Sequence, residues 1–194
     1  MFTTISGYEK FRSLSYERLL EVTAKQIDLG IELGGVTKFD YAVPKALANG
    51  DMRVEFKVQR YNTLLCDTER KLIFGEAYYR DGLLHSDDGP AWIEKNKDEQ
   101  IVACFWWCRG QLHRLDGPAC ERYSPDSFPN KAWWVNNIHI PFFEDYAEPR
   151  LFMDYVVRWR NSIDVVAGAM QIAKYNGWIN ENGAEVAETI IWIL

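Results

Sequence analysis

The chain has 194 residues, 47% of them apolar, which suffices for one folded domain or for one domain with a helical appendage. Eight Trp, ten Tyr and ten Phe exclude an intrinsically disordered chain. The formal net charge is −6, and no basic patch is present. We therefore expect no nucleic acid among the partners, because that binding depends on cations that contact phosphates.

The first residues lack the basic and apolar regions of a secretion signal, and no apolar run has the length of a membrane span. We therefore expect a cytoplasmic protein without membrane association. Cys66, Cys104, Cys108 and Cys120 show no CxxC spacing, so we expect reduced thiols, no metal and no cofactor.

The first predicted element is an amphipathic helix at residues 15–29, for which Ser15 can serve as the N-cap. Residues 43–50 can hold one helical turn closed by Asn-Gly. Residues 52–58 then alternate between apolar and polar side chains, which predicts a strand with one buried face. Residues 71–79 form the next predicted strand.

One pattern then occurs twice in full, at residues 78–91 and 106–119, and begins a third time at 133–139. The starts lie 28 and 27 residues apart, which is typical of one supersecondary unit repeated along the chain. Each copy has an aromatic pair followed by two residues that suit the type I′ turn of a β-hairpin. The turn pairs are Asp81-Gly82, Arg109-Gly110 and Asn136-Asn137.

Near the end of both full copies is Asp-Gly-Pro, a tripeptide that ends one strand and sets the direction of the next. Strands at residues 91–94 and 101–108 complete an antiparallel meander. The residues to which we assign a structural role in the repeat are Gly82, His85, Asp88, Gly89, Pro90, Gly110, His113, Asp116, Gly117 and Pro118.

The last part of the chain has helical patterns. We expect a short helix at 142–147, a helix at 149–160 that begins with proline, and a helix from Ser162, as N-cap, to Lys174 that ends at Asn176-Gly177.

Residues 184–194 carry an apolar helical face that must be buried, so this segment could mediate a homo-oligomer. The predicted fold is α+β: an N-terminal helical segment at 1–51, an antiparallel β-meander of hairpin repeats at 52–141, and a C-terminal helical segment at 142–194.

The pattern Gly-x-x-His-Arg-x-Asp-Gly-Pro-Ala after an aromatic pair resembles the MORN-like repeats of proteins from bacteriophages and large DNA viruses. The earlier copy has Ser86 where the pattern has Arg, and the third copy keeps only the aromatic pair and the turn. The resemblance covers roughly a third of the chain and implies a viral origin rather than an activity. The full match comprises Gly110, His113, Arg114, Asp116, Gly117, Pro118 and Ala119.

His85 and His113 are the obvious candidates for acid–base catalysis, but they occupy the same place in two copies of one unit. A hydrogen bond that fixes a loop is needed in every repeat, whereas a reaction centre rarely is, so we favour a structural role. His139 is displaced by one residue and should face the other side of its strand. Cys104, Cys108 and His113 could share a site, but they lack a credible fourth zinc ligand. The sequence has no Walker, dinucleotide, GxSxG or HExxH motif.

The aromatic pairs suggest an interface, because neighbours on a strand point to opposite faces of the sheet. One predicted face carries Tyr79, Trp107 and Trp134, and the other carries Tyr78, Trp106 and Trp133. Helices and loops can cover most of both faces, which we consider the more common outcome. If one row stays open, its aromatics have the composition of a protein-binding hot spot. The arginines expected to border it are Arg80, Arg109 and Arg122.

Our preferred hypothesis is a non-enzymatic, phage-encoded accessory factor that docks on a host protein and modulates or inhibits it. The first alternative is an enzyme or small-ligand binder that uses the His and Asp residues of the repeat loops. The second alternative is a self-assembling or virion component.

Overall fold

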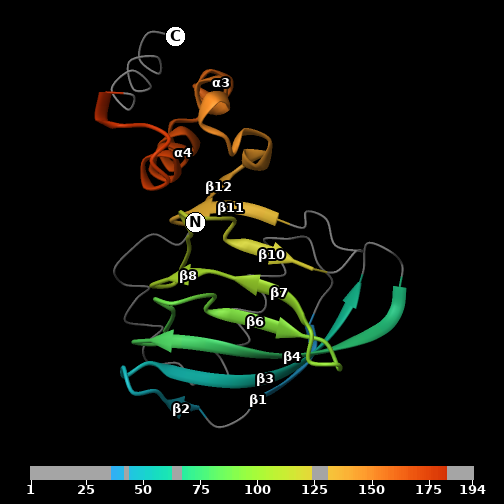
Figure 1. Ribbon diagram of the computed structural model, residues 1–194. Helices are drawn as coiled ribbons and strands as arrows, with labels where there is room; N and C mark the ends of the chain where they lie inside the picture. Colours follow the sequence, from blue (N-terminus) through green and yellow to red (C-terminus); the bar gives the residue numbers. More distant parts are fainter. Residues whose placement is uncertain (1–35, 42–43, 63–66, 124–130, 183–194) are drawn as a thin grey trace. The chain divides into compact units, whose positions relative to one another are not determined.

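The computed structural model describes residues 36–41, 44–62, 67–123 and 131–182 (Figure 1). The fold is α+β, as predicted, with antiparallel strands followed in the chain by helices. The predicted helix at 15–29, the apolar segment 184–194 and Cys66 lie outside the described residues. The chain divides into two compact units, Met1–Gly110 and Gln111–Leu194, which we call unit 1 and unit 2.

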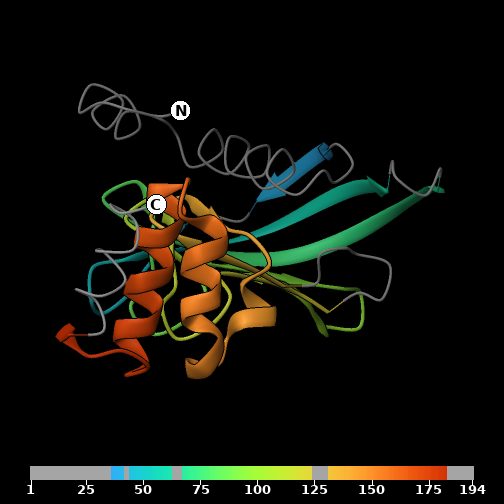
Figure 2. The same cartoon turned by 90° about the horizontal axis from the view of Figure 1, so that it is seen from above.

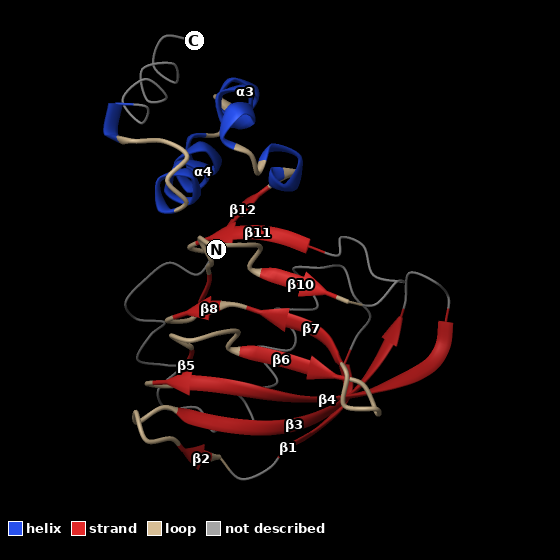
Figure 3. Cartoon of the chain, viewed as in Figure 1, coloured by secondary structure: helices blue, strands red, loops and turns tan. Residues whose placement is uncertain are grey.

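Unit 1 contains a sheet with the strand order β1-β3-β4-β6-β7 (Figure 3). All of these neighbours are antiparallel, so the chain runs as a meander, while β2 also pairs with β3 and β5 with β4. The strands are β1 (Val36–Tyr41), β2 (Lys45–Ala46), β3 (Met52–Asn62), β4 (Asp67–Arg80), β5 (Leu83–Leu84), β6 (Trp92–Lys95), β7 (Ile101–Phe105) and β8 (Trp107–Cys108).

The long strands β3 and β4 form because their side chains alternate between a buried and a solvent-facing side. Val54 and Phe56 are buried, as are Ala77 and Tyr79 across the ladder. β3 pairs with β4 over its whole length, whereas β6 pairs with β4 at Phe74–Ala77 (Figure 1). The strand predicted at 52–58 is therefore confirmed as β3, which continues beyond the alternating pattern to Asn62.

The sheet begins earlier than predicted, at β1, because tertiary pairing with β3 places that segment in a strand. The helical turn predicted at 43–50 is wrong. Lys45–Ala46 is a strand paired with β3, and the chain then turns with Gly50 at φ 86°. Asn49 stabilises this turn because its Oδ1 accepts the Asp51 N–H at 3.0 Å.

The core of unit 1 depends on a glycine in the middle of β4. A Cβ on Gly75 would lie 2.3 Å from Cζ of Phe56, its partner across the ladder, and 2.4 Å from the carbonyl oxygen of Ile93. The missing side chain lets the Phe56 ring lie against Trp92, with ring centroids 4.2 Å apart. Glycine is therefore needed here for a close approach, not for an unusual φ.

Unit 2 contains the antiparallel strands β10, β11 and β12, followed by two α-helices. The helices α3 and α4 lie side by side (Figure 2), and α4 contacts β12. The core includes Trp133, Val135, Ile140, Tyr155 and Ile172. The elements are β9 (Gln111–Leu112), β10 (Cys120–Arg122), β11 (Lys131–Val135), β12 (Ile138–Ile140), the 3-10 helices Phe143–Tyr146 and Pro149–Leu151, α3 (Phe152–Trp159) and α4 (Ile163–Tyr175).

The C-terminal helices lie where the sequence predicts them, with local differences. The segment predicted as a short helix is a single 3-10 turn, and the helix that begins at Pro149 opens with a 3-10 turn before α3. Ser162 occupies the N-cap position of α4, but its side chain forms no capping hydrogen bond. Gly177 has φ 69° and follows α4, as expected for a helix stop.

The strand predicted at 101–108 is interrupted at Trp106, so that β7 and β8 are separate. The carbonyl oxygen of Trp107 accepts the N–H of Ser86, which belongs to the preceding hairpin, at 3.3 Å. β8 is therefore hydrogen-bonded to the preceding hairpin and is not part of the ladder that β7 forms with β6.

Candidate functional site

All three predicted turns have positive φ at both central residues, which identifies them as type I′ turns. Arginine and aspartate adopt this conformation less readily than glycine, so the surrounding contacts must stabilise it. The angles are 53° and 77° at Asp81 and Gly82, 49° and 76° at Arg109 and Gly110, and 51° and 66° at Asn136 and Asn137.

In unit 1, the turn at residues 109–110 is bound to the hairpin before it through main-chain groups and one imidazole. The Gly110 N–H donates to the carbonyl oxygen of Leu84 at 2.8 Å. The Arg109 N–H donates to Nδ1 of His85 at 3.2 Å. We call this combination of a main-chain bond and an imidazole bond the turn latch.

Unit 2 contains a second turn latch with the same atoms. The Asn137 N–H donates to the carbonyl oxygen of Leu112 at 3.0 Å, and the Asn136 N–H donates to Nδ1 of His113 at 3.3 Å. Asn137 adds a bond that the first latch cannot form, because its side-chain Oδ1 accepts the Leu112 N–H at 2.7 Å. Both repeat histidines are thus hydrogen-bond acceptors within the fold.

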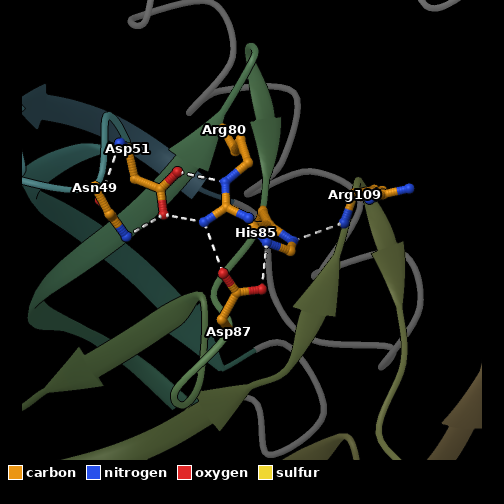
Figure 4. Close-up of polar contacts among 6 residues, drawn as sticks. All are labelled: Asn49, Asp51, Arg80, His85, Asp87 and Arg109. Carbon is orange, nitrogen blue, oxygen red and sulfur yellow. Dashed lines mark hydrogen bonds and ion pairs between the residues drawn. The ribbon is translucent and has the colours of Figure 1, made fainter.

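His85 also belongs to a polar network that links four segments of unit 1 (Figure 4). Its Nε2 lies 2.9 Å from Oδ1 of Asp87, and the Arg80 guanidinium donates to the other Asp87 oxygen at 2.7 Å. Arg80 also holds Asp51 through two hydrogen bonds of 2.6 and 2.8 Å, and Asn49 donates to Asp51 at 2.9 Å. Arg80 is therefore engaged in ion pairs within the fold, and its side chain is partly exposed.

The hydrogen bonds in this network determine its charge states. Since Nδ1 of His85 accepts a main-chain N–H, the proton of the neutral ring is on Nε2 and points to Asp87. The hydrogen bonds from Arg80 lower the pKa values of both Asp51 and Asp87. Neither ring nitrogen of His85 has a lone pair available to take a proton from a substrate.

In unit 2, Arg114 binds the Asp-Gly-Pro loop. Its Nε donates to Asp116 at 2.9 Å, and its Nη1 donates to the Pro118 carbonyl oxygen and to Glu121, each at 3.1 Å. A Cβ on Gly117 would lie 2.8 Å from the Arg114 guanidinium carbon. The glycine therefore makes room for the arginine, which explains why the two occur together in the repeat pattern.

The first copy has Ser86 in place of the arginine, and its loop differs accordingly. A Cβ on Gly89 would meet no atom within 4 Å. Asp88 is exposed, and the carboxylate that contacts the His85 ring is the neighbouring Asp87. Pro90 precedes the buried Ala91, whose carbonyl oxygen accepts the Tyr78 N–H at 2.8 Å.

The residues predicted to form an aromatic row are found in different environments. Tyr79 is only 1% exposed, and Trp107 is also buried. Trp134 is half-buried and lies against the exposed His139, with ring centroids 4.8 Å apart. Arg109 is exposed at the tip of its turn, and Arg122 is half-buried. Two of the three aromatic side chains, Tyr79 and Trp107, are therefore part of the core of unit 1.

His139 faces the opposite side of its strand from the equivalent repeat position, as predicted. It pairs with Trp134, whereas Ile140 pairs with Trp133 and is buried. Partial burial lowers the pKa of His113.

A second cluster lies on the solvent-facing side of β3, β4 and β6 in unit 1. Residues directly opposite each other on an antiparallel ladder share a face. The ladder places Lys57 and Lys95 on either side of Phe74, and it places Glu55 next to Glu76. We call the set formed by Arg53, Glu55, Lys57, Phe74, Glu76, Tyr78 and Lys95 the outer face.

Glu76 is the centre of the outer face. It accepts hydrogen bonds from Lys95 at 2.6 Å, from Arg53 at 3.0 Å and from the Tyr78 hydroxyl at 2.9 Å. Burial alone would raise the pKa of Glu76, but these three donors outweigh it and lower the pKa to about 2. Arg53 also bridges to Glu55 at 3.2 Å, which offsets the repulsion between the two adjacent glutamates.

The outer face contains a hollow of about 540 Å³, within the size range of roughly 300–1,000 Å³ that is usual for ligand sites. It extends from the strands to the β6–β7 turn, where Asn96 Oδ1 accepts the N–H groups of Asp98 and Gln100 at 2.9 and 3.0 Å. Phe74 is 38% exposed at this hollow. The hollow is lined by Arg53, Glu55, Phe56, Lys57, Phe74, Gly75, Glu76, Lys95, Asn96, Lys97 and Glu99.

Sequence analysis identified both strands of this face but not the site, because it does not fix the register between them. The alternating Arg53, Glu55 and Lys57 could have pointed to a charged ladder. Their partners on β4 could not be assigned, because the pairing register of the two strands depends on which residues form the turn between them.

Among the described residues, no group of three or more His, Cys, Asp or Glu side chains is placed to hold a metal ion. Cys104, Cys108 and Cys120 are free thiols, and burial raises the pKa of Cys120 to about 12. In the described part of the chain, no helix has both the length and the apolar character needed to span a bilayer.

Comparison with models of protein families, with curated proteins and with solved structures found no match to this chain.

Proposed function

We propose that this protein is a non-enzymatic binding protein that docks on another protein through the outer face of unit 1. The observation that carries the proposal is the hollow of about 540 Å³, which is open to solvent and combines an exposed aromatic ring with charged side chains. Exposed aromatic rings and arginine side chains, here Phe74 and Arg53, are enriched at protein interfaces.

The turn latches support a binding role over catalysis by the repeat histidines. His85 Nδ1 accepts the Arg109 N–H, and its Nε2 is directed at Asp87. The equivalent His113 Nδ1 accepts the Asn136 N–H. A general base needs a lone pair within reach of the substrate, and the latch occupies that of Nδ1 in both copies.

The resemblance to MORN-like repeats of viral proteins supports a host protein as the partner. In this proposal the chain is a phage-encoded accessory factor that acts in the host cytoplasm and modulates or inhibits its target. A rigid sheet suits such a role because docking then orders few groups, so that little binding free energy is lost to conformational entropy.

The experiment is affinity capture from host lysate followed by binding measurements with the purified partner. Phe74→Ala removes the exposed ring of the outer face, and Tyr175→Ala removes an exposed aromatic side chain from α4 of unit 2 as the matched control. We expect Phe74→Ala to weaken binding at least about tenfold, the loss typical of an interface anchor. Equal affinity of both variants and the wild type would contradict the proposed surface.

A further inference from the structure

The arrangement of cations around Phe74 indicates what the outer face binds. Lys57 and Lys95 lie directly opposite Phe74 on the two neighbouring strands, and the Lys57 ammonium is 5.8 Å from the centre of the ring. Lys97, in the β6–β7 turn, lines the same hollow. An exposed aromatic ring thus has ammonium groups on both sides.

The hydrogen-bonding groups of the hollow favour an acceptor-rich ligand. Glu76 already accepts from Lys95, Arg53 and Tyr78. An ammonium group has three N–H donors, so the bond to Glu76 leaves further donors on Lys95. Lys57 and Lys97 are exposed and bring three donors each. The hollow is lined by four cationic side chains and three glutamates, a net charge of +1, although the whole chain has a net charge of −6.

We propose that the outer face binds an extended, carboxylate-rich segment of a partner protein, with an apolar side chain against Phe74 and carboxylates at Lys57 and Lys95. This inference rests on the proposed function and specifies the chemistry of the partner.

The spacing of the strands fits an extended segment better than a single small anion. Lys57 and Lys95 are on strands separated by β4, so their backbones are about 10 Å apart, at about 4.8 Å per strand. Side chains four residues apart in an extended peptide lie on one side, about 13 Å apart, and the side chain midway between them lies on the same side, where it can contact Phe74. Flexible lysines can bridge the difference in spacing.

Nucleic acid fits this surface less well. Glu55, Glu76 and Glu99 also line the hollow, and they would repel a backbone with a charge on every phosphate. A peptide can place neutral residues beside these glutamates and carboxylates beside the lysines. The proposed ligand is therefore an acidic polypeptide and not a general polyanion.

The test measures binding of a fluorescein-labelled peptide with the repeated sequence Glu-Ser-Val-Ser, which places Glu and Val alternately on one side of an extended chain, by fluorescence polarisation. The control peptide has Gln in place of Glu. We expect the glutamate peptide to bind at least about tenfold more tightly than the glutamine peptide, which corresponds to about 1.4 kcal/mol. Equal binding of both peptides, or no binding of either, would overturn the inference.

Two double variants locate the site. Lys57→Gln with Lys97→Gln removes exposed charges at the hollow, and Lys131→Gln with Lys174→Gln removes two exposed charges from unit 2. We expect the first pair to weaken peptide binding at least about tenfold and the second pair to leave it within about twofold. Equal losses would show a nonspecific charge effect and would overturn the inference.

A single-stranded oligonucleotide with the same charge as the peptide serves as the competitor. Poor displacement of the peptide supports the proposal, and displacement as strong as that by unlabelled peptide would show a general polyanion site and overturn it.

Failure of the acidic-peptide inference can be distinguished from failure of the proposed function. If Phe74→Ala abolishes partner capture but the glutamate peptide fails, only the inference falls. If the peptide binds but Phe74→Ala leaves capture intact, the proposed docking surface falls.

Discussion

The turn latch of unit 1 makes a quantitative prediction about His85. His85→Phe keeps a ring in the buried position but removes the acceptor of the Arg109 N–H. A buried donor left without a partner costs about 1–3 kcal/mol, so we expect the free energy of unfolding to fall by about 2 kcal/mol. The loss of the contact with Asp87 adds little, because that carboxylate is exposed and can bind water.

Urea unfolding monitored by tryptophan fluorescence measures the effect. With a slope of about 2 kcal/mol per molar urea, the midpoint should fall by about 1 M. His139→Phe is the matched control, because His139 is exposed and forms no part of a latch, and we expect a change within about 0.5 kcal/mol. If His85→Phe changes stability no more than His139→Phe, the latch does not stabilise the fold, and the recurrence of histidine in both full copies of the repeat has another cause.

Three further predictions concern other positions. Gly75→Ala should destabilise unit 1 by about 1–3 kcal/mol in urea unfolding, because its Cβ would lie 2.4 Å from the main-chain oxygen of Ile93. The pKa of His113 is lowered in the folded protein, so the unfolded chain binds the proton more readily. The stability that neutral His113 contributes should therefore be present above about pH 6.5 and decrease as the pH falls below it. In unfolding curves measured between pH 7.5 and 5, His113→Phe should reduce this pH dependence. Glu76 has a pKa of about 2 against an ordinary value of 4.5, so its contribution to the free energy of unfolding should be present above pH 4.5 and be lost as the pH falls towards 2. Glu76→Gln should reduce the pH dependence of stability in this range. At pH 7 the same variant should cost about 1 kcal/mol, because the partly exposed Lys95 loses its charged partner.

The features that sequence analysis predicted correctly are those set by local chemistry. Paired positive-φ residues in the turns, alternation from Met52 onward and the helix stop at Gly177 each depend on neighbouring residues. The segment at 44–51 shows the limit of such reasoning. Its composition permits a helical turn, but pairing of Lys45–Ala46 with β3 supplies hydrogen bonds that only the tertiary structure reveals.

The candidate site was less predictable because it depends on register. The sequence indicated that aromatic residues alternate across the sheet, but it did not show that Tyr79 and Trp107 would be buried while Phe74 stays exposed. Likewise, arginine is a residue type that is common at interfaces, yet Arg80 binds Asp51, which lies 29 residues earlier in the chain. Such long-range pairs require the alignment of β3 with β4, which local patterns do not encode.

The residue at the third position after each turn indicates what packs against that hairpin. His85 and His113 occupy this position where the next element is another turn, and each accepts a turn N–H. Ile140 occupies this position in the third hairpin, against which α4 packs. A Cβ on Gly168 of that helix would lie 2.5 Å from the Ile140 Cδ1. A turn offers a main-chain donor that needs an acceptor, whereas a helix face offers apolar surface, so the change from histidine to isoleucine follows from the change in partner. Replacing Ile140 with His would therefore place an imidazole against an apolar helix surface, and the hairpin array ends in the chain where this residue becomes apolar.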